Sequence, residues 1–277
     1  TSDDSPTDLR LMDLVAPLGF GQRGLLLCPH KTGKTKLLQH LANAVIRNHP
    51  DAHVMVLLID VCPEDVTAFR EQVRCQVIAS TFDQPPENHL RLADLTMERA
   101  QRLAENKQDA VVIVDSLTRL AKCYTTAAAQ QGRATPGMIN PTSLMRAKKL
   151  FGAGRCLKEG GSLTVIGVMG IDGPNKADDT IVEEFKGTAT MELVLDASLA
   201  RAGITPAINL QASGTKRAEL LQNERQQEGL KVLRSITSTT RSAAAIPQLK
   251  SMMEKAPTND ELLARIHEWV RMMDQSR

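Results

Sequence analysis

A short segment near the start of the chain has the residue types of a phosphate-binding loop. CPHKTGKT, at positions 28–35, matches the pattern GxxxxGK[ST] except that Cys28 stands in place of the first glycine. Gly33 lets the backbone turn its N–H groups inward, Lys34 reaches the outer phosphates of a nucleotide, and the Thr35 hydroxyl is a ligand for Mg²⁺. The residues expected to complete this cradle are Lys31, Thr32 and Lys36. The segment predicts a site for ATP and its magnesium ion.

The competing explanation is a chance Gly-Lys-Thr before an amphipathic helix. The flanking sequence argues against it, because the apolar run 24–27 precedes the motif and apolar residues at helical spacing follow it. Those residues are Leu37, Leu38, Leu41 and Val45. Asp115 ends another apolar run, VVIVD, and an acid at the end of a strand after such a loop commonly holds magnesium through water. Asp115 is therefore the second predicted metal ligand.

Continuous apolar segments of strand length recur along the chain, as expected for a sheet covered on both faces. They are 54–60, 77–80, 110–115, 163–170 and 191–196. A segment at 89–106 has leucines and alanines on one helical face. Strands that alternate with helices predict an α/β fold with a mostly parallel central sheet and right-handed crossovers.

Two polar segments interrupt this alternation, and we expect both to be loops. They span 125–140 and 171–179 and follow strands, so they leave the sheet at its carboxyl edge, where ligands of open α/β sheets bind. We expect residues 1–8 to be disordered or a cut end, and 9–277 to form one ATP-binding domain whose part 216–277 is helical.

Composition narrows the class of protein. The 277 residues are 42% hydrophobic and carry a net charge of +2, so any basic binding surface must be local. An aromatic share of 3% disfavours a protein that stacks many bases on rings. The five cysteines have no CxxC or zinc-like spacing, and no apolar run is long enough to span a membrane. These features predict a cytoplasmic protein with no membrane partner.

At this point a series of short stretches resembles a known family, the ATPase domain of the bacterial transcription termination factor Rho. The resemblance covers nearly the whole chain. The stretches that carry it are GQRGLLL at 21–27, KTGKT at 31–35, VMVLLID at 54–60, ASTFDQP at 79–85, VDSLTRLAKCY at 114–124, LFGAGR at 150–155, KEGGSLTVI at 158–166, EEFKGT at 183–188, MEL at 191–193, PAI at 206–208 and SGT at 213–215.

The resemblance implies a RecA-like P-loop fold, a hexameric ring that hydrolyses ATP between subunits, and RNA pulled through its centre, with RNA polymerase as a further partner. The residues at the positions of the family's RNA-holding pore loops are Gly132, Arg133, Gly137 and Lys176. Arg119 and Lys186 fall at positions that couple RNA to the nucleotide across the subunit interface. Without the resemblance, Lys176 is better explained as a solvated loop lysine, and its family position is what favours a role with RNA. For Lys186, a role at the subunit interface and an ordinary surface lysine are equally good explanations. A rotary or secretion ATPase of the same superfamily matches the pore-loop stretches less closely.

The chain departs from the family where hydrolysis takes place. Val61 stands where the family has the glutamate that polarises the attacking water, and loss of a general base costs on the order of a hundred- to ten-thousand-fold in rate. Glu64 is a substitute only if a carboxylate displaced by three positions, roughly 10 Å along a strand, can still reach the water. The family's Arg-Lys pair, which carries the arginine presented to the neighbouring subunit, is Lys216-Arg217 here.

Two further positions in the same pocket differ. Gly203 replaces an arginine of the family, and Thr205 replaces the aromatic residue that stacks on adenine. The four departures favour an alternative to the RNA-dependent motor: a hydrolysis-impaired relative that binds nucleotide and RNA, assembles with itself or with an active relative, and regulates without pulling.

Overall fold

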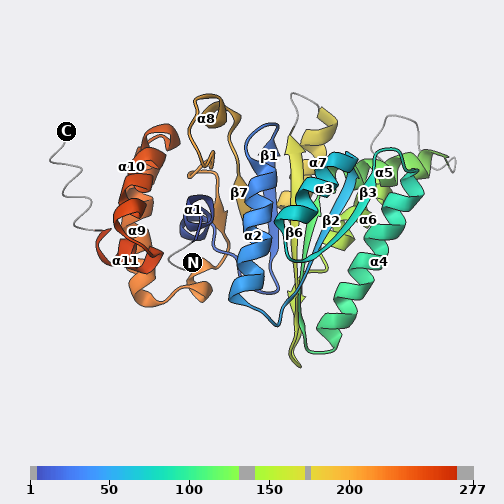
Figure 1. Cartoon of the computed structure of the whole chain (residues 1–277), viewed down its shortest axis with the longest axis horizontal. Coiled ribbons are helices and arrows are strands. Elements are labelled where there is room, and N and C mark those ends of the chain that lie inside the picture. Colours follow the sequence, from blue (N-terminus) through green and yellow to red (C-terminus); the bar gives the residue numbers. More distant parts are fainter. Residues whose placement is uncertain (1–4, 131–140, 172–175, 267–277) are drawn as a thin grey trace.

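The computed structural model describes residues 5–130, 141–171 and 176–266, and it has a central sheet of eight strands with helices on both faces (Figure 1). The strand order is β3-β2-β4-β6-β1-β7-β8, with β5 beside β6. All neighbours pair in parallel except β5 and β8, which run antiparallel to β6 and β7. The strands are β1 (Arg23–Pro29), β2 (His53–Val61), β3 (Gln76–Thr81), β4 (Asp109–Asp115), β5 (Arg155–Cys156), β6 (Ser162–Ile171), β7 (Met191–Val194) and β8 (Gly214–Thr215).

Helices fill the connections between the strands and form the end of the described chain. They are α1 (Thr7–Val15), α2 (Lys34–Asn48), α3 (Pro63–Gln72), α4 (Pro86–Glu105), α5 (Leu117–Gln130), α6 (Pro141–Phe151), α7 (Lys176–Lys186), α8 (Ala197–Arg201), the 3₁₀ turn η1 (Ala218–Leu221), α9 (Glu224–Thr239), α10 (Ser242–Lys255) and α11 (Asn259–Ala264). None of the helices in this described part combines the length and apolar character needed to cross a bilayer.

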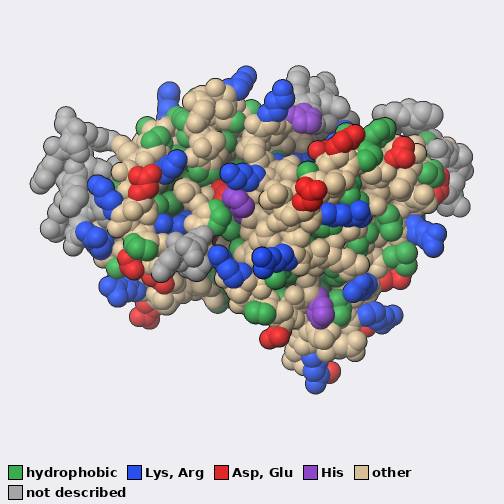
Figure 2. Space-filling view, viewed as in Figure 1, with side chains coloured by type: hydrophobic (Ala, Val, Ile, Leu, Met, Phe, Trp, Pro, Cys, Tyr) green, Lys and Arg blue, Asp and Glu red, His purple; other side chains and the backbone are tan. Residues whose placement is uncertain are grey.

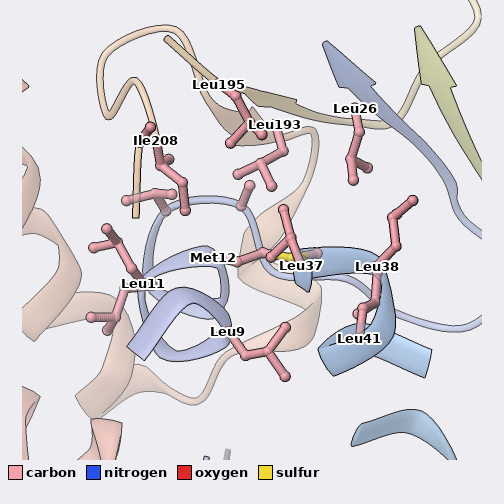
Figure 3. Close-up of a cluster of buried hydrophobic side chains, with 14 of the residues drawn as sticks. Leu9, Leu11, Met12, Leu26, Leu37, Leu38, Leu41, Leu193, Leu195 and Ile208 are labelled. Atoms are coloured by element: carbon pink, nitrogen blue, oxygen red, sulfur yellow. The ribbon is translucent and has the colours of Figure 1, made fainter. Parts of the chain in front are cut away.

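Alternate residues of the central strands feed two separate cores. Leu26, Val56 and Ile113 pack with α1, α2, α3 and the C-terminal helices, and Leu25, Leu57 and Val112 pack with α4 to α7. Figure 3 shows the first core, where leucines of α1 and α2 meet Leu193, Leu195 and Ile208. Because both faces are covered, the strands read as unbroken apolar runs in the sequence. The predicted α/β fold with a mostly parallel sheet is confirmed.

Two predicted loops are shorter than expected. The segment 125–140 was expected to be a loop, but α5 continues to Gln130, and Ala127 in this alanine-rich end of the helix is buried. Residues 131–140 lie outside the described range. The segment 171–179 contains the end of β6 and the start of α7, which turns Ile181, Val182 and Phe185 into that core. In both cases tertiary burial of a few apolar residues extends a helix into a polar-looking segment.

Helix α1 joins the C-terminal helices to the rest of the domain. The buried guanidinium of Arg10 donates to the backbone carbonyls of Met253 (2.9 Å) and Ala256 (2.7 Å) and to Oδ1 of Asn259 (3.2 Å). Asn259 donates in return to the carbonyl oxygen of Arg10 (3.0 Å). The helix begins at Thr7, so Thr7 and Asp8 of the polar segment 1–8 are part of the ordered domain, and residues 1–4 lie outside the described range.

Candidate nucleotide-binding site

The phosphate loop connects the end of β1 to the start of α2. Gly33 caps α2 with φ = 87°, a left-handed conformation that favours glycine, and Lys31 has φ = 59°. The Thr32 hydroxyl donates to the carbonyl oxygen of Pro29 (2.7 Å) and closes the turn. Successive backbone N–H groups in such a turn line one concavity, next to the unpaired N–H groups of the first helical turn. The backbone geometry from 29 to 35 therefore suits a bound anion.

Cys28 belongs to the strand and not to the loop. It lies in β1, and its side chain is buried in the first core. Burial raises the pKa of the Cys28 thiol well above its ordinary value, so the thiol stays protonated. Cys28, which replaces the motif's first glycine, is thus an inert apolar residue beneath the loop and has no chemical role in the site.

Lys34 and Asp115 meet at the carboxyl edge of the sheet, although they come from different strand–helix units. The Lys34 ammonium lies 2.8 Å from Oδ1 and 2.7 Å from Oδ2 of Asp115. Asp115 ends β4, and the side chain of Asp115 is 9% exposed, whereas that of Lys34 is 32% exposed. The predicted phosphate-binding lysine and the predicted magnesium ligand therefore share one site.

The residues around this pair fit a Mg²⁺ ion held with a nucleotide. The Thr35 side chain is exposed in the first turn of α2, and the Asp115 carboxylate is next to that turn through its contact with Lys34. Hydroxyl and carboxylate oxygens are hard ligands of the kind that Mg²⁺ prefers, with phosphate and water completing its shell. Within the described residues, His, Cys, Asp and Glu form no cluster of three that could hold a metal by protein ligands alone.

A pocket of about 300 Å³ adjoins the loop. Its lining includes the predicted residues Thr32, Gly33, Lys36 and Thr205, together with Pro206. Because the pocket opens beside the phosphate loop, it has the place that the nucleoside part of a bound nucleotide would need. Thr205, which the resemblance places beside the base, lines this pocket.

Three charged or titratable residues of the same pocket gave no signal in the sequence. They are Asp8 of α1, His40 of α2 and Lys250 of α10. Asp8 and His40 are hydrogen-bonded to each other, with 2.8 Å between His40 Nδ1 and Asp8 Oδ2. Residues this far apart in the sequence follow no local spacing rule, so only the docking of α1 and α10 brings them to the pocket.

The end of β2 offers no carboxylate where the family has its glutamate. Val61 is buried, and a bulge between Ile59 and Val61 gives Asp60 φ = 56°. Arg119 of α5 donates to the carbonyl oxygen of Asp60 and so holds this bend from within the same chain. Glu64 lies exposed in the first turn of α3, with no hydrogen bond to the loop among the described residues.

Lys216 and Arg217 lie at the opposite end of the sheet from the phosphate loop. Thr215 pairs with Met191, which is level with Gly24 near the start of β1. The Lys216 ammonium donates to the carbonyl oxygen of Ala189 (2.7 Å), whereas the Arg217 side chain is 75% exposed. The two residues predicted as catalytic therefore differ: the lysine is engaged within the chain, and the arginine projects outward.

The residues expected to hold RNA are only partly described. Gly132, Arg133 and Gly137 lie outside the described residues. Lys176 is the first residue of α7 and not a loop residue as predicted, because α7 begins there. Lys186, at the other end of α7, pairs with Glu183 at 2.8 Å on the helix surface. Figure 2 shows basic and acidic side chains interspersed over the visible face, in keeping with the low net charge.

Comparisons with known proteins agree with this geometry. Residues 8–215 match the ATP synthase alpha/beta family, nucleotide-binding domain. Transcription termination factor Rho of Pseudomonas aeruginosa is 44% identical over 252 residues, covering 91% of this chain and 60% of that protein. Rho of Bacillus subtilis is also 44% identical, over 94% of this chain and 61% of its own length. The chain thus spans about three fifths of the length of these relatives.

A solved structure supports the same fold. An ATPase described as prototypical for the type III secretion system of pathogenic bacteria superposes with a TM-score of 0.79 over 94% of this chain and 83% of its own. Its sequence is 18% identical, so this likeness concerns the fold alone. With the family match over residues 8–215, the RecA-like sheet order and the phosphate loop, the chain belongs to the ATP synthase alpha/beta family of nucleotide-binding domains, and its sequence resembles the ATPase domain of Rho.

Proposed function

We propose that this chain binds ATP with Mg²⁺ and hydrolyses ATP in response to RNA, as one subunit of a ring that moves along RNA. The observation that carries the proposal is the convergence of the Gly33 turn, Lys34 and Asp115 at one edge of the sheet. The sequence similarity to Rho supports the part of the proposal that concerns RNA.

Each residue at this edge has a role that follows from its chemistry. The backbone N–H groups around Gly33 would hold the phosphates, and the Lys34 ammonium would exchange Asp115 for a phosphate oxygen when the nucleotide arrives. Asp115 and Thr35 would then be free to orient the magnesium ion. When bound, Mg²⁺ neutralises charge on the outer phosphates.

The position of Arg217 supports assembly as a ring. It lies at the opposite edge of the sheet from Lys34, about five residues of strand away, or roughly 17 Å. An exposed guanidinium at that edge can approach a γ-phosphate only on another copy of the chain, where its planar fork would bridge two oxygens. Six copies would also repeat Arg133 and Lys176 around a pore and raise the local positive charge.

The setting that this proposal implies is the cytoplasm, where RNA polymerase would supply the transcript. All five cysteines are free thiols, as suits a reducing compartment.

A second candidate is a hydrolysis-impaired relative that binds nucleotide and RNA and assembles with itself or with an active relative. The observation that favours it is Val61, a buried apolar side chain at the position of the family's general base. A site of this kind would retain Lys34, Thr35 and Asp115 for binding and turn ATP over slowly.

One experiment separates the two candidates. Phosphate release is measured with and without single-stranded RNA for the wild type, Lys34→Ala, Val61→Glu and Val61→Gln. RNA-stimulated release that Lys34→Ala abolishes and Val61→Glu does not increase supports the motor. Negligible wild-type release that rises at least tenfold in Val61→Glu, but not in the matched amide Val61→Gln, supports the impaired relative. Wild-type chain that binds no nucleotide would contradict both.

A further inference from the structure

The pocket beside the phosphate loop contains a carboxylate–histidine pair. Both oxygens of Asp8 contact Nδ1 of His40, at 2.9 Å for Oδ1 and 2.8 Å for Oδ2. The two side chains are 17% and 26% exposed, so solvent competes only weakly for this contact. We infer that this pair, which neither the motif nor the family match assigns, selects the base of the nucleotide; this inference rests on the nucleotide binding proposed above.

His40 has the right place along α2 to meet a base. Lys36, Leu37 and His40 all line the pocket, which puts them on one face of the helix. His40 follows Lys34 by six positions, or about 9 Å along the helix axis. That rise is comparable to the span between the β-phosphate and the base of a nucleotide. With phosphates at the amino end of α2, the base would lie beside His40.

The contact with Asp8 fixes which ring nitrogen carries the proton. An ionised carboxylate only accepts hydrogen bonds, so the proton of a neutral His40 is on Nδ1. Nε2 is then an acceptor, and it has no hydrogen-bond partner among residues 5–130, 141–171 and 176–266. With a neutral His40, the pair therefore presents a hydrogen-bond acceptor at Nε2 of a residue that lines the pocket.

The rest of the pocket leaves base selection to hydrogen bonds. No Phe, Tyr or Trp is among its described lining residues, and Thr205 and Pro206 line it together with residues of α2. An acceptor at Nε2 favours a base edge that carries an N–H donor, such as the 6-amino group of adenine. It disfavours the 6-oxo group of hypoxanthine, which would place two acceptors face to face.

A single atom exchange at Asp8 should reverse this polarity. The backbone N–H of Leu9 donates to Asp8 Oδ1 at 2.9 Å, so in Asp8→Asn the amide oxygen keeps that position. The amide nitrogen then takes the place of Oδ2, the oxygen nearer to His40, and donates to Nδ1. The ring proton moves to Nε2, which becomes a donor. The same tautomer switch underlies the effect of an Asp-to-Asn change behind a catalytic histidine.

The test is calorimetric titration of ATP and ITP with Mg²⁺, because these nucleotides differ at the 6-position edge of the base. We expect wild type to bind ATP roughly five- to tenfold more tightly than ITP, the range of one hydrogen bond. His40→Ala should bring the ratio close to one, and Asp8→Asn should lower it below one. Asp51→Asn, the same change on an exposed turn, should leave the wild-type ratio. Thermal unfolding checks that every variant is folded.

The outcomes separate this inference from the proposal on which it rests. A wild-type preference for ATP that persists unchanged in both His40→Ala and Asp8→Asn, while Lys34→Ala abolishes binding of both nucleotides, overturns the base-selecting pair and leaves nucleotide binding intact. Equal affinity of the wild type for ATP and ITP overturns it as well. Absence of binding to the wild type removes the proposed function, and the inference with it.

Discussion

The ammonium of Lys34 lies 2.7 Å from Oδ2 of Asp115, so the phosphate loop and the end of β4 are joined by an ion pair. Lys34→Met would leave a carboxylate that is 9% exposed without its cation, which should cost about 1–2 kcal/mol of unfolding free energy, less than for a fully buried pair. It should also abolish binding of Mg-ATP. Urea denaturation and calorimetry measure the two effects. Lys231→Met, on the exposed surface of α9, is the control and should change stability by less than about 0.5 kcal/mol. Equal effects of the two changes would contradict the role of the pair.

The left-handed backbone of Gly33 gives a second prediction. A Cβ added at Gly33 would meet no atom within 4 Å, so Gly33→Ala causes no steric clash. The substitution therefore measures only the cost of the left-handed backbone conformation (φ = 87°). We expect a loss of about 1–2 kcal/mol by urea denaturation, the usual cost of a left-handed non-glycine residue. Gly187→Ala is the matched control, because its Cβ is equally unobstructed and its φ lies outside the left-handed range. A cost at Gly33 no larger than at Gly187 would show that the loop is not held in this conformation.

Arg10 gives a third prediction, because its guanidinium is buried and bonded to the C-terminal helices. Arg10→Ala removes three hydrogen bonds and leaves the carbonyls of Met253 and Ala256 unpaired in a buried place. We expect a loss of about 2–4 kcal/mol of unfolding free energy, because two buried carbonyl acceptors lose their charged donor at the same time.

The control for Arg10 is Arg102→Ala on α4. Arg102 also makes an ion pair, with Glu105 at 2.6 Å, but its side chain is 78% exposed. A loss of less than about 1 kcal/mol is expected there. Comparable losses for the two arginines would contradict the clamp between α1 and the C-terminal helices.

Substitutions of Lys216 and Arg217 should have different effects, the first on stability and the second on ATP turnover. Lys216→Met removes the hydrogen bond to Ala189 and should cost about 1 kcal/mol of unfolding free energy, whereas Arg217→Ala should leave stability unchanged, because the arginine is 75% exposed.

If Arg217 acts on a neighbouring subunit, Arg217→Ala should lower the ATPase rate at least tenfold, and Arg201→Ala, another exposed arginine, should not. Mixing Arg217→Ala with Lys34→Ala subunits should restore part of the activity, since some interfaces would then have both groups intact. A turnover loss in Lys216→Met alone would assign the role to the lysine.

Much of the core fold is set by local sequence. The runs at 54–60 and 110–115 were predictable because strands covered on both faces need no polar alternation, and both became central strands. The loop at 31–35 was predictable because its turn needs glycine at Gly33 and because a helix must follow it. Asp115 was predictable from its place at the end of a strand, where the parallel sheet brings it to the same edge.

Other features depended on the tertiary structure. The segment 125–140 looked like a loop, yet residues 125–130 are helical and Ala127 among them is buried. From its sequence position, Lys216 was predicted to be a catalytic residue. In the structure its ammonium donates to a carbonyl of its own chain, and this contact depends on the pairing of β8 with β7. Neither outcome has a signal in residue type or spacing.

The sequence by itself determined the phosphate loop, its lysine and the place of Asp115 at the end of a strand, because these depend on backbone rules that act within a few residues. The tertiary structure alone decided which groups line the pocket beside that loop. Asp8 and His40 are 32 positions apart, and Arg10 and Asn259 are 249 apart. Such pairs form only when α1 docks between the phosphate-loop helix and the C-terminal helices (Figure 1), because their contacts come from packing between elements and not from any local preference.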